Sequence, residues 1–143
     1  MTVAHILATK GRDVVTIQPH RTLAEAARLL AERRIGAVVV AGADRTVLGI
    51  LSERDIVRML AAHGASVLDD PVSRHMTSKV MMCSPSSDIN EVMGMMTEGR
   101  FRHLPVIEDG KLAGIVSIGD VVKHRLAEIE AEHRAMREYI TMA

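Results

Sequence analysis

A serine and an aspartate stand three residues apart at two places in the chain. Ser52 precedes Asp55 in the segment GILSERDIV, and Ser117 precedes Asp120 in the segment GIVSIGDVV. Both segments follow an apolar run that predicts a β-strand, and both continue with the apolar spacing of a helix. At such a junction a hydroxyl and a carboxylate can cap the helix, or they can bind a ligand beyond the end of the strand.

Helix capping is the structural interpretation of this pattern. In a capping box, the serine hydroxyl accepts a hydrogen bond from the N–H of the aspartate, and the carboxylate accepts one from the N–H of the serine. Each pair would then satisfy N–H groups that have no partner within the helix. The pattern alone is compatible with both interpretations.

Ligand binding is the functional interpretation. The free N–H groups and the positive dipole end of a helix favour an anion, and phosphate is the natural one. The serine hydroxyl adds a hydrogen bond to that phosphate. The aspartate repels phosphate, but it accepts hydrogen bonds from the two vicinal hydroxyls of a ribose. The pair therefore indicates a nucleotide whose phosphate and ribose bind at one turn.

The two segments belong to a repeat that covers most of the chain. Pro19 and Pro85 are 66 residues apart, whereas Gly49 and Gly114 are 65 apart. The lost residue falls in an expected hairpin turn, where both strands keep their register. Each copy predicts the order β-α-β-β-α. The expected strands are 14–17, 37–41 and 47–51, then 80–83, 104–107 and 112–116, with helices at about 22–33 and 88–98 and from Ser52 and Ser117.

Two such copies predict an α+β protein whose halves pack with pseudo-two-fold symmetry. A unit of about 50 residues is marginal alone, and each copy leaves an apolar sheet face for the other to cover. We expect the first repeat at 1–64, the second at 65–125 and a C-terminal helical extension at 126–143.

Composition argues against several classes of function. The formal net charge is zero, and one Phe, one Tyr and no Trp give no support for nucleic-acid or membrane-surface binding. No apolar run is long enough to cross a bilayer. The single cysteine, Cys83, forms no internal disulfide, so we expect a cytoplasmic protein. The seven histidines show no metal-ligand spacing, and no nucleophile lies beside a base, so we predict neither a metal site nor an enzyme.

The repeated arrangement resembles the CBS (cystathionine beta-synthase) domain pair, or Bateman module, over nearly all of residues 1–125. The matching segments are 14–19, 35–40 and 49–55 in the first copy and 76–77, 80, 85, 102–106 and 114–120 in the second. The resemblance implies a regulatory protein that is not itself catalytic. It also implies clefts between the halves that bind adenosyl ligands, with AMP expected first and ADP, ATP, NAD or S-adenosylmethionine as the other candidates.

By this resemblance, Ser117 and Asp120 contact the phosphate and ribose of a second site, and Arg102 and His103 correspond to a basic pair that contacts phosphate. An arginine fork binds phosphate through two hydrogen bonds, and a histidine adds a donor. The alternative is that both basic residues are simply solvated at the start of a strand.

The first site, with Ser52 and Asp55, differs because Gly36 and Ala37 occupy the positions of the basic pair. Arg54 is the candidate replacement cation, although an exposed arginine at a helix start is an equal alternative. An adenine ring needs an apolar slot, and many of its candidates could instead be core residues. The candidates are Thr16, Ile17, Ile35 and Val38 in the first copy and Met82, Cys83, Phe101 and Leu104 in the second. Pro105, which follows Leu104, is also expected among the ligand-binding residues.

The C-terminal helix has a seam at coiled-coil spacing. Val122, Leu126, Ile129, His133, Met136 and Ile140 recur at intervals of four and three residues. The seam predicts a homodimer, and the alternative is an amphipathic helix lying on its own module. The effector protein that would respond to the ligand is unknown. Two rival functions remain: an adaptor whose turns are only caps, and a small enzyme that hydrolyses a nucleotide.

Overall fold

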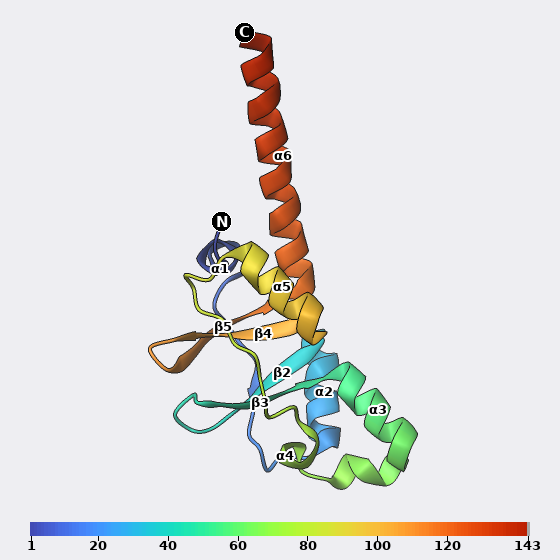
Figure 1. Ribbon diagram of the computed structural model, residues 1–143. Helices are drawn as coiled ribbons and strands as arrows, with labels where there is room; N and C mark the ends of the chain where they lie inside the picture. The colour runs from blue at the N-terminus through green and yellow to red at the C-terminus, as the bar shows by residue number, and fades with distance from the viewer. Residues whose placement is uncertain (143) are drawn as a thin grey trace.

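Two small β-sheets, each flanked by helices, form the body of the protein, and one long helix projects from it (Figure 1). The computed structural model describes residues 1–142; Ala143, the last residue of the expected extension, lies outside this range. The elements are α1 (Val3–Lys10), β1 (Thr16–Ile17), α2 (Leu23–Arg33), β2 (Ala37–Ala41), β3 (Val47–Ser52), α3 (Glu53–His63), a 3-10 helix η1 (Ala65–Asp69), α4 (Val72–His75), α5 (Ile89–Gly99), β4 (His103–Glu108), β5 (Lys111–Ser117) and α6 (Ile118–Met142).

The predicted repeat is visible in the pairing of the strands. β2 pairs with β3 and β4 with β5, both antiparallel, so that Ser52 lies opposite Ala37 and Ser117 lies opposite His103. β1 adds a short parallel strand to β2. The expected strand at 80–83 is reduced to one parallel bridge between Cys83 and Val106. In both copies a proline, which has no N–H to donate, follows two residues later and limits the first strand.

The central helix of each copy begins and ends in the same way. Thr22 caps α2 by accepting a hydrogen bond from the Glu25 N–H (3.2 Å), and Asp88 caps α5 by accepting one from Asn90. Each helix ends at an arginine in the left-handed region, Arg34 at φ 53° and Arg100 at φ 57°. These ends place the start of the following strand, β2 or β4, next to the region between the two halves.

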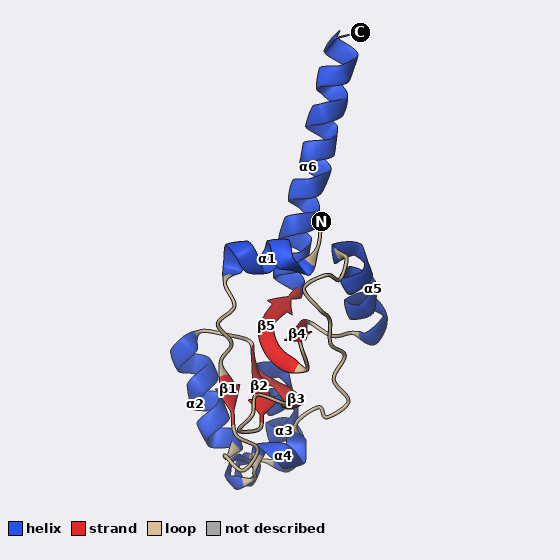
Figure 2. Ribbon diagram, turned by 90° about the vertical axis from the view of Figure 1, so that its left-hand side faces the viewer, coloured by secondary structure: helices blue, strands red, loops and turns tan. Residues whose placement is uncertain are grey.

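The leading helix of each repeat packs against the other half. Val3, Ile6 and Leu7 of α1 are buried in the core of the second half, and α1 lies beside β5 in Figure 2. Val72 of α4 is buried in the core of the first half. Residues 1–64 and 65–125 remain our proposed division by repeat. The helix that begins each repeat, α1 or α4, nevertheless packs in the core of the other half. Because α1 and α4 are each joined by the chain to one half and packed in the other, they hold the two halves together.

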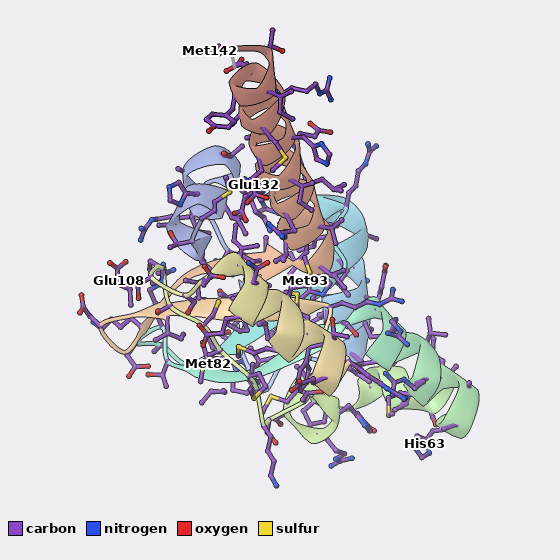
Figure 3. The ribbon with its side chains drawn as sticks, turned by 45° about the horizontal axis from the view of Figure 1, so that its top comes forward. His63, Met82, Met93, Glu108, Glu132 and Met142 are labelled. Carbon is purple, nitrogen blue, oxygen red and sulfur yellow. The ribbon has the colours of Figure 1, made fainter. Side chains whose placement is uncertain are left out.

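α6 is one continuous helix of 25 residues. Val121 near its start is buried, whereas residues 130–142 are exposed, and their side chains project on all sides as far as Met142 (Figure 3). Residues 126–142 therefore continue the last helix of the second repeat. Within residues 1–142, no helix combines the length and the apolar character that crossing a membrane needs.

Candidate ligand-binding clefts

The two Ser-x-x-Asp turns form the capping boxes that their spacing predicts. The Ser52 N–H donates to Asp55 Oδ2 (2.9 Å) and the Asp55 N–H donates to Ser52 Oγ (3.2 Å). Ser117 and Asp120 repeat this geometry at 2.9 and 3.1 Å. Capping uses only Oδ2 of each carboxylate, and no hydrogen bond within residues 1–142 reaches Oδ1. A turn can therefore cap its helix and still accept a hydrogen bond from a ligand.

The first cleft lies at the N-terminus of α3, where the first half meets the second. It has a volume of about 230 Å³. β2, β3 and α3 supply its first wall, and the segments before and at the start of β4 supply the opposite wall. The lining residues are Gly36, Ala37, Ile50, Ser52, Glu53, Arg54, Asp55 and Arg58 from the first half and Thr77, Arg100, Phe101, Arg102 and His103 from the second.

Positive charge dominates the first cleft. Its lining includes four arginines, at positions 54, 58, 100 and 102, against two carboxylates, Glu53 and Asp55. Two of these arginines come from each half. With the positive dipole end of α3, they make the cleft suited to an anionic ligand. Asp55 remains available for hydroxyl groups at the same turn.

The two members of the basic pair lie differently: His103 lines the second cleft, where we expected it, as well as the first, whereas Arg102 lines the first cleft alone. We assigned Arg102 and His103 to the site of Ser117 and Asp120, but Arg102 lines the cleft of Ser52 and Asp55. β4 begins at the boundary between the halves, so the residue preceding it faces the opposite half. The second half therefore supplies the first cleft with positive charge that Gly36 and Ala37 cannot provide. Arg54, the expected replacement cation, is one of four arginines in this cleft.

The second cleft lies between α1, the start of β2 and the end of β5, with a volume of about 240 Å³. Its lining residues are Lys10, Asp13, Val14, Val15, Ile35, Gly36, Ala37, His103, Ile115 and Ser117. Lys10 Nζ donates to Asp120 Oδ2 (2.7 Å) and to the Ile115 carbonyl (3.0 Å). Burial raises the pKa of Asp120, but the hydrogen bonds from Lys10 and the Ser117 N–H outweigh it and hold that pKa below its usual value.

His103 lies between the two clefts and lines both. Its ring packs against Gly36, where a Cβ atom would lie 3.4 Å from His103 Cε1. Burial lowers the pKa of His103, and the positive charges of Lys10 and Arg102 lower it further. His103 is therefore neutral at neutral pH, and an anion in either cleft would favour its protonation.

Most of the expected adenine-contacting residues lie away from the clefts. Val38 and Leu104 are fully buried in the two cores, and Ile17, Cys83 and Pro105 are also buried. Burial raises the pKa of the Cys83 thiol to about 11. Thr16 and Met82 are exposed and line neither cleft, and Met82 lies in the segment before α5 (Figure 3). Phe101 lines the first cleft and Ile35 the second.

Several lining residues were missed because they come from the opposite half. Thr77 reaches the first cleft through two backbone hydrogen bonds with Ile50, of 3.0 and 2.9 Å. Lys10 reaches the second cleft because α1 packs on that half. Arg58 could have been found from the sequence, since it lies one helical turn after Asp55.

The chain matches the CBS domain family over residues 3–62 and 72–127. A crystal structure of a CBS-domain containing protein from Agrobacterium tumefaciens is similar, with a TM-score of 0.84 and 52% identity over 87% of this chain and 99% of that one. An uncharacterized 17.7 kDa protein from Acidianus ambivalens is 38% identical, over 85% of this chain and 71% of its own length. A CBS domain protein from Pyrobaculum aerophilum, solved in complex with AMP, has a TM-score of 0.75 and 27% identity over 84% of this chain and 89% of that one.

The protein thus belongs to the CBS domain family, and the fold is that of a CBS domain pair. Proteins of this kind are generally regulatory. The resemblance noted from the repeated Gly-Ile-x-Ser-x-x-Asp segments is confirmed.

Proposed function

We propose that this protein is a regulatory module whose first cleft binds an adenine nucleotide, with AMP as the first candidate. The observation that supports this most is the convergence of Ser52, Asp55 and arginines from both halves at the N-terminus of α3. The relative from Pyrobaculum aerophilum that was solved with AMP supports the choice of ligand.

The chemistry of the cleft suits the two polar parts of a nucleotide. Asp55 Oδ1 accepts a hydrogen bond from the ribose, since Oδ2 is already used by the Ser52 N–H. The phosphate lies toward the arginines and the Ser52 hydroxyl, where its charge is balanced. Phe101 and Ile50 provide apolar surface for the base.

Ligand binding would act on the relation between the halves. Because Arg102 and Thr77 face Asp55 across the cleft, a nucleotide contacts both halves at once. Its affinity is greatest for the arrangement in which both sets of contacts are made, so binding shifts the population toward that arrangement. An effector protein that contacts both halves then responds to the nucleotide, and no catalytic step is needed.

The protein acts as a homodimer in this proposal. The seam on α6 is exposed in a single chain, with Leu126, Met136 and Ile140 all more than half accessible. An apolar stripe at heptad spacing on a projecting helix is suited to the same stripe of a second copy.

Thermal unfolding with AMP, ADP, ATP, NAD and S-adenosylmethionine tests the binding function. A ligand at about a hundred times its dissociation constant adds about 2.7 kcal/mol, which raises the midpoint by roughly 5 °C in a domain of this size. Asp55→Ala should abolish the shift. Asp88→Ala, which removes the N-cap of α5, is the matched control: it should lower the basal midpoint and keep the shift.

Two other outcomes would favour the rival functions. If no ligand shifts the midpoint of protein shown to be free of bound nucleotide, the turns are only caps and the adaptor function gains support. Conversion of a nucleotide during the incubation would instead indicate an enzyme.

A further inference from the structure

We propose that α6 forms a parallel, in-register coiled coil with α6 of a second copy, so that the two modules lie at the same end of the paired helices. This pairing rests on the homodimer of the proposed function and adds its orientation and register. Three features of α6 support it: the face that the body leaves open, the charges beside the seam, and the histidine within the seam.

The body of the protein covers the side of α6 that lies away from the seam. Val121 is buried, and His124 and Glu128, on the same face of the helix, are half-buried. Val122 and Leu126, the first two seam residues, are 42% and 55% exposed in the same turns. A second helix can therefore approach the seam from the side that the body leaves open.

The residues that flank the seam are mostly charged. In a coiled coil, residues at these positions contact the partner helix and set its orientation. They are Arg125, Glu132 and Tyr139 on one side of the seam and Lys123, Glu130 and Arg137 on the other. Within residues 1–142, Arg125 is the only one of them in an ion pair, with Glu128 of its own helix. The other charges are therefore available to a second copy.

A parallel, in-register pair brings opposite charges together. Glu132 of one helix then lies beside Arg137 of the second copy, and Arg125 lies beside Glu130 of the second copy. Because the two helices are equivalent, each of these contacts occurs twice. The charges beside the seam are thus complementary in this orientation.

An antiparallel pair that covers the whole seam brings like charges together instead. Its layers place Val122 opposite Ile140 of the second copy. Glu130 then faces Glu130 of the second copy, and Glu132 faces Glu132 of the second copy, and such like-charge contacts oppose association. Sliding one helix to separate the carboxylates would leave part of the seam uncovered. The charges therefore select the parallel orientation.

His133 favours the same arrangement, because it is the one polar residue of the seam. A parallel, in-register pair places both His133 rings in one layer, where one imidazole can donate a hydrogen bond to the other. In the antiparallel pair His133 lies opposite Ile129, and a polar group buried without a partner is costly. A single polar layer of this kind specifies register in coiled coils.

Disulfide cross-linking of the whole chain tests the orientation. Ile140→Cys places a thiol in the seam near the end of α6, and the native Cys83 is buried. In the parallel pair the two introduced thiols share a layer, so mild oxidation should join most of the dimer into a cross-linked species that a thiol reductant separates. Glu138→Cys is the matched control, because it adds a thiol to the exposed outer face of the same turn and should stay uncross-linked.

Reversal of one charge tests the pairing beside the seam. Glu132→Arg places two cations side by side and should weaken the dimer roughly tenfold. Adding Arg137→Glu to this variant makes the contact attractive again and should restore the dimer. Glu138→Arg makes the same charge change on the outer face and should leave the dissociation constant unchanged. Sedimentation equilibrium measures the dissociation constant of each protein.

Two results would overturn the parallel pairing of a protein that is dimeric. Ile140→Cys could cross-link no better than Glu138→Cys, or Glu132→Arg could dimerise as tightly as the wild type. A wild type that is monomeric would overturn the homodimer of the proposed function, and this pairing with it. Binding of AMP to the first cleft is measured separately, by the shift of the unfolding midpoint.

Discussion

Each Ser-x-x-Asp turn serves the fold and can also serve a ligand, because the two tasks use different atoms. Asp55 Oδ2 completes the capping box while Oδ1 stays free of hydrogen bonds within residues 1–142. The sequence predicted both interpretations of the turn, and the capping geometry is confirmed. Ligand binding stays a prediction, and its surroundings could not be predicted because the lining comes from both halves.

His103 should make the stability of the fold depend on pH. In the unfolded chain a histidine titrates near ~6.5, and burial lowers the pKa of His103 in the folded state. As the pH falls, the unfolded chain therefore binds the proton first. The contribution of His103 to stability is fully present above the unfolded pKa and is lost as the pH falls through the folded pKa.

Urea unfolding between about pH 8 and pH 5 measures this effect, with the unfolded histidine pKa of ~6.5 inside the window. As the pH is lowered, the free energy of unfolding should decrease more steeply in the wild type than in His103→Gln. His20→Gln, which removes an exposed histidine, should keep the wild-type slope. Equal slopes for all three proteins would contradict the burial argument.

At the scale of elements, hydrophobic spacing and caps predicted the regular parts of the fold. The helices expected at 22–33 and 88–98 are α2 and α5, because their starts and apolar faces are local features. The strand at 80–83 failed because its pairing depends on a neighbouring strand and ends near Pro85. The packing of α1 and α4 against the opposite halves depends on contacts between residues far apart in the chain, so no local sequence pattern predicts it. It is also the reason why Lys10 was not foreseen.

Two glycines should respond in opposite directions to alanine. A Cβ on Gly49 of β3 would lie 2.6 Å from Met76 Sδ and 2.8 Å from the Thr77 carbonyl, which is backbone beside the first cleft. Gly49→Ala should therefore cost about 1–3 kcal/mol. Gly94 lies within α5 with nothing within 4 Å of its added Cβ. Gly94→Ala should stabilise the protein by about 0.5–1 kcal/mol.

Chemical denaturation of both variants checks this prediction. A Gly49→Ala protein as stable as the wild type would mean that the close approach of Thr77 to β3 is not a constraint on the fold, and a destabilised Gly94→Ala protein would contradict the second half of the prediction.

At the scale of the whole molecule, α6 is the feature that a single chain does not explain. It projects from the body of the protein (Figure 1), its residues 130–142 are exposed, and the seam residues Leu126 and Ile140 are 55% and 66% exposed. An exposed apolar stripe of this length is typical of a surface that a partner covers. The heptad spacing was evident from the sequence, and the structure adds that the seam is not covered by the chain's own body.

Sedimentation velocity should therefore show a dimer for the wild type and a monomer for Leu126→Glu, since a carboxylate in the seam would be buried without a partner. Ala131→Glu adds the same charge away from the seam and should remain dimeric. A monomeric wild type, or a dimeric Leu126→Glu variant, would show that the seam is not the contact between copies.

The central claim is that the first cleft holds a nucleotide across the boundary of the two halves. A crystal structure of the protein grown with AMP tests it most directly. The account predicts a ribose hydroxyl within hydrogen-bonding distance of Asp55 Oδ1 and a phosphate next to the N-terminus of α3 and Arg102. AMP bound away from Asp55, or a first cleft that stays empty at saturating AMP, would contradict it.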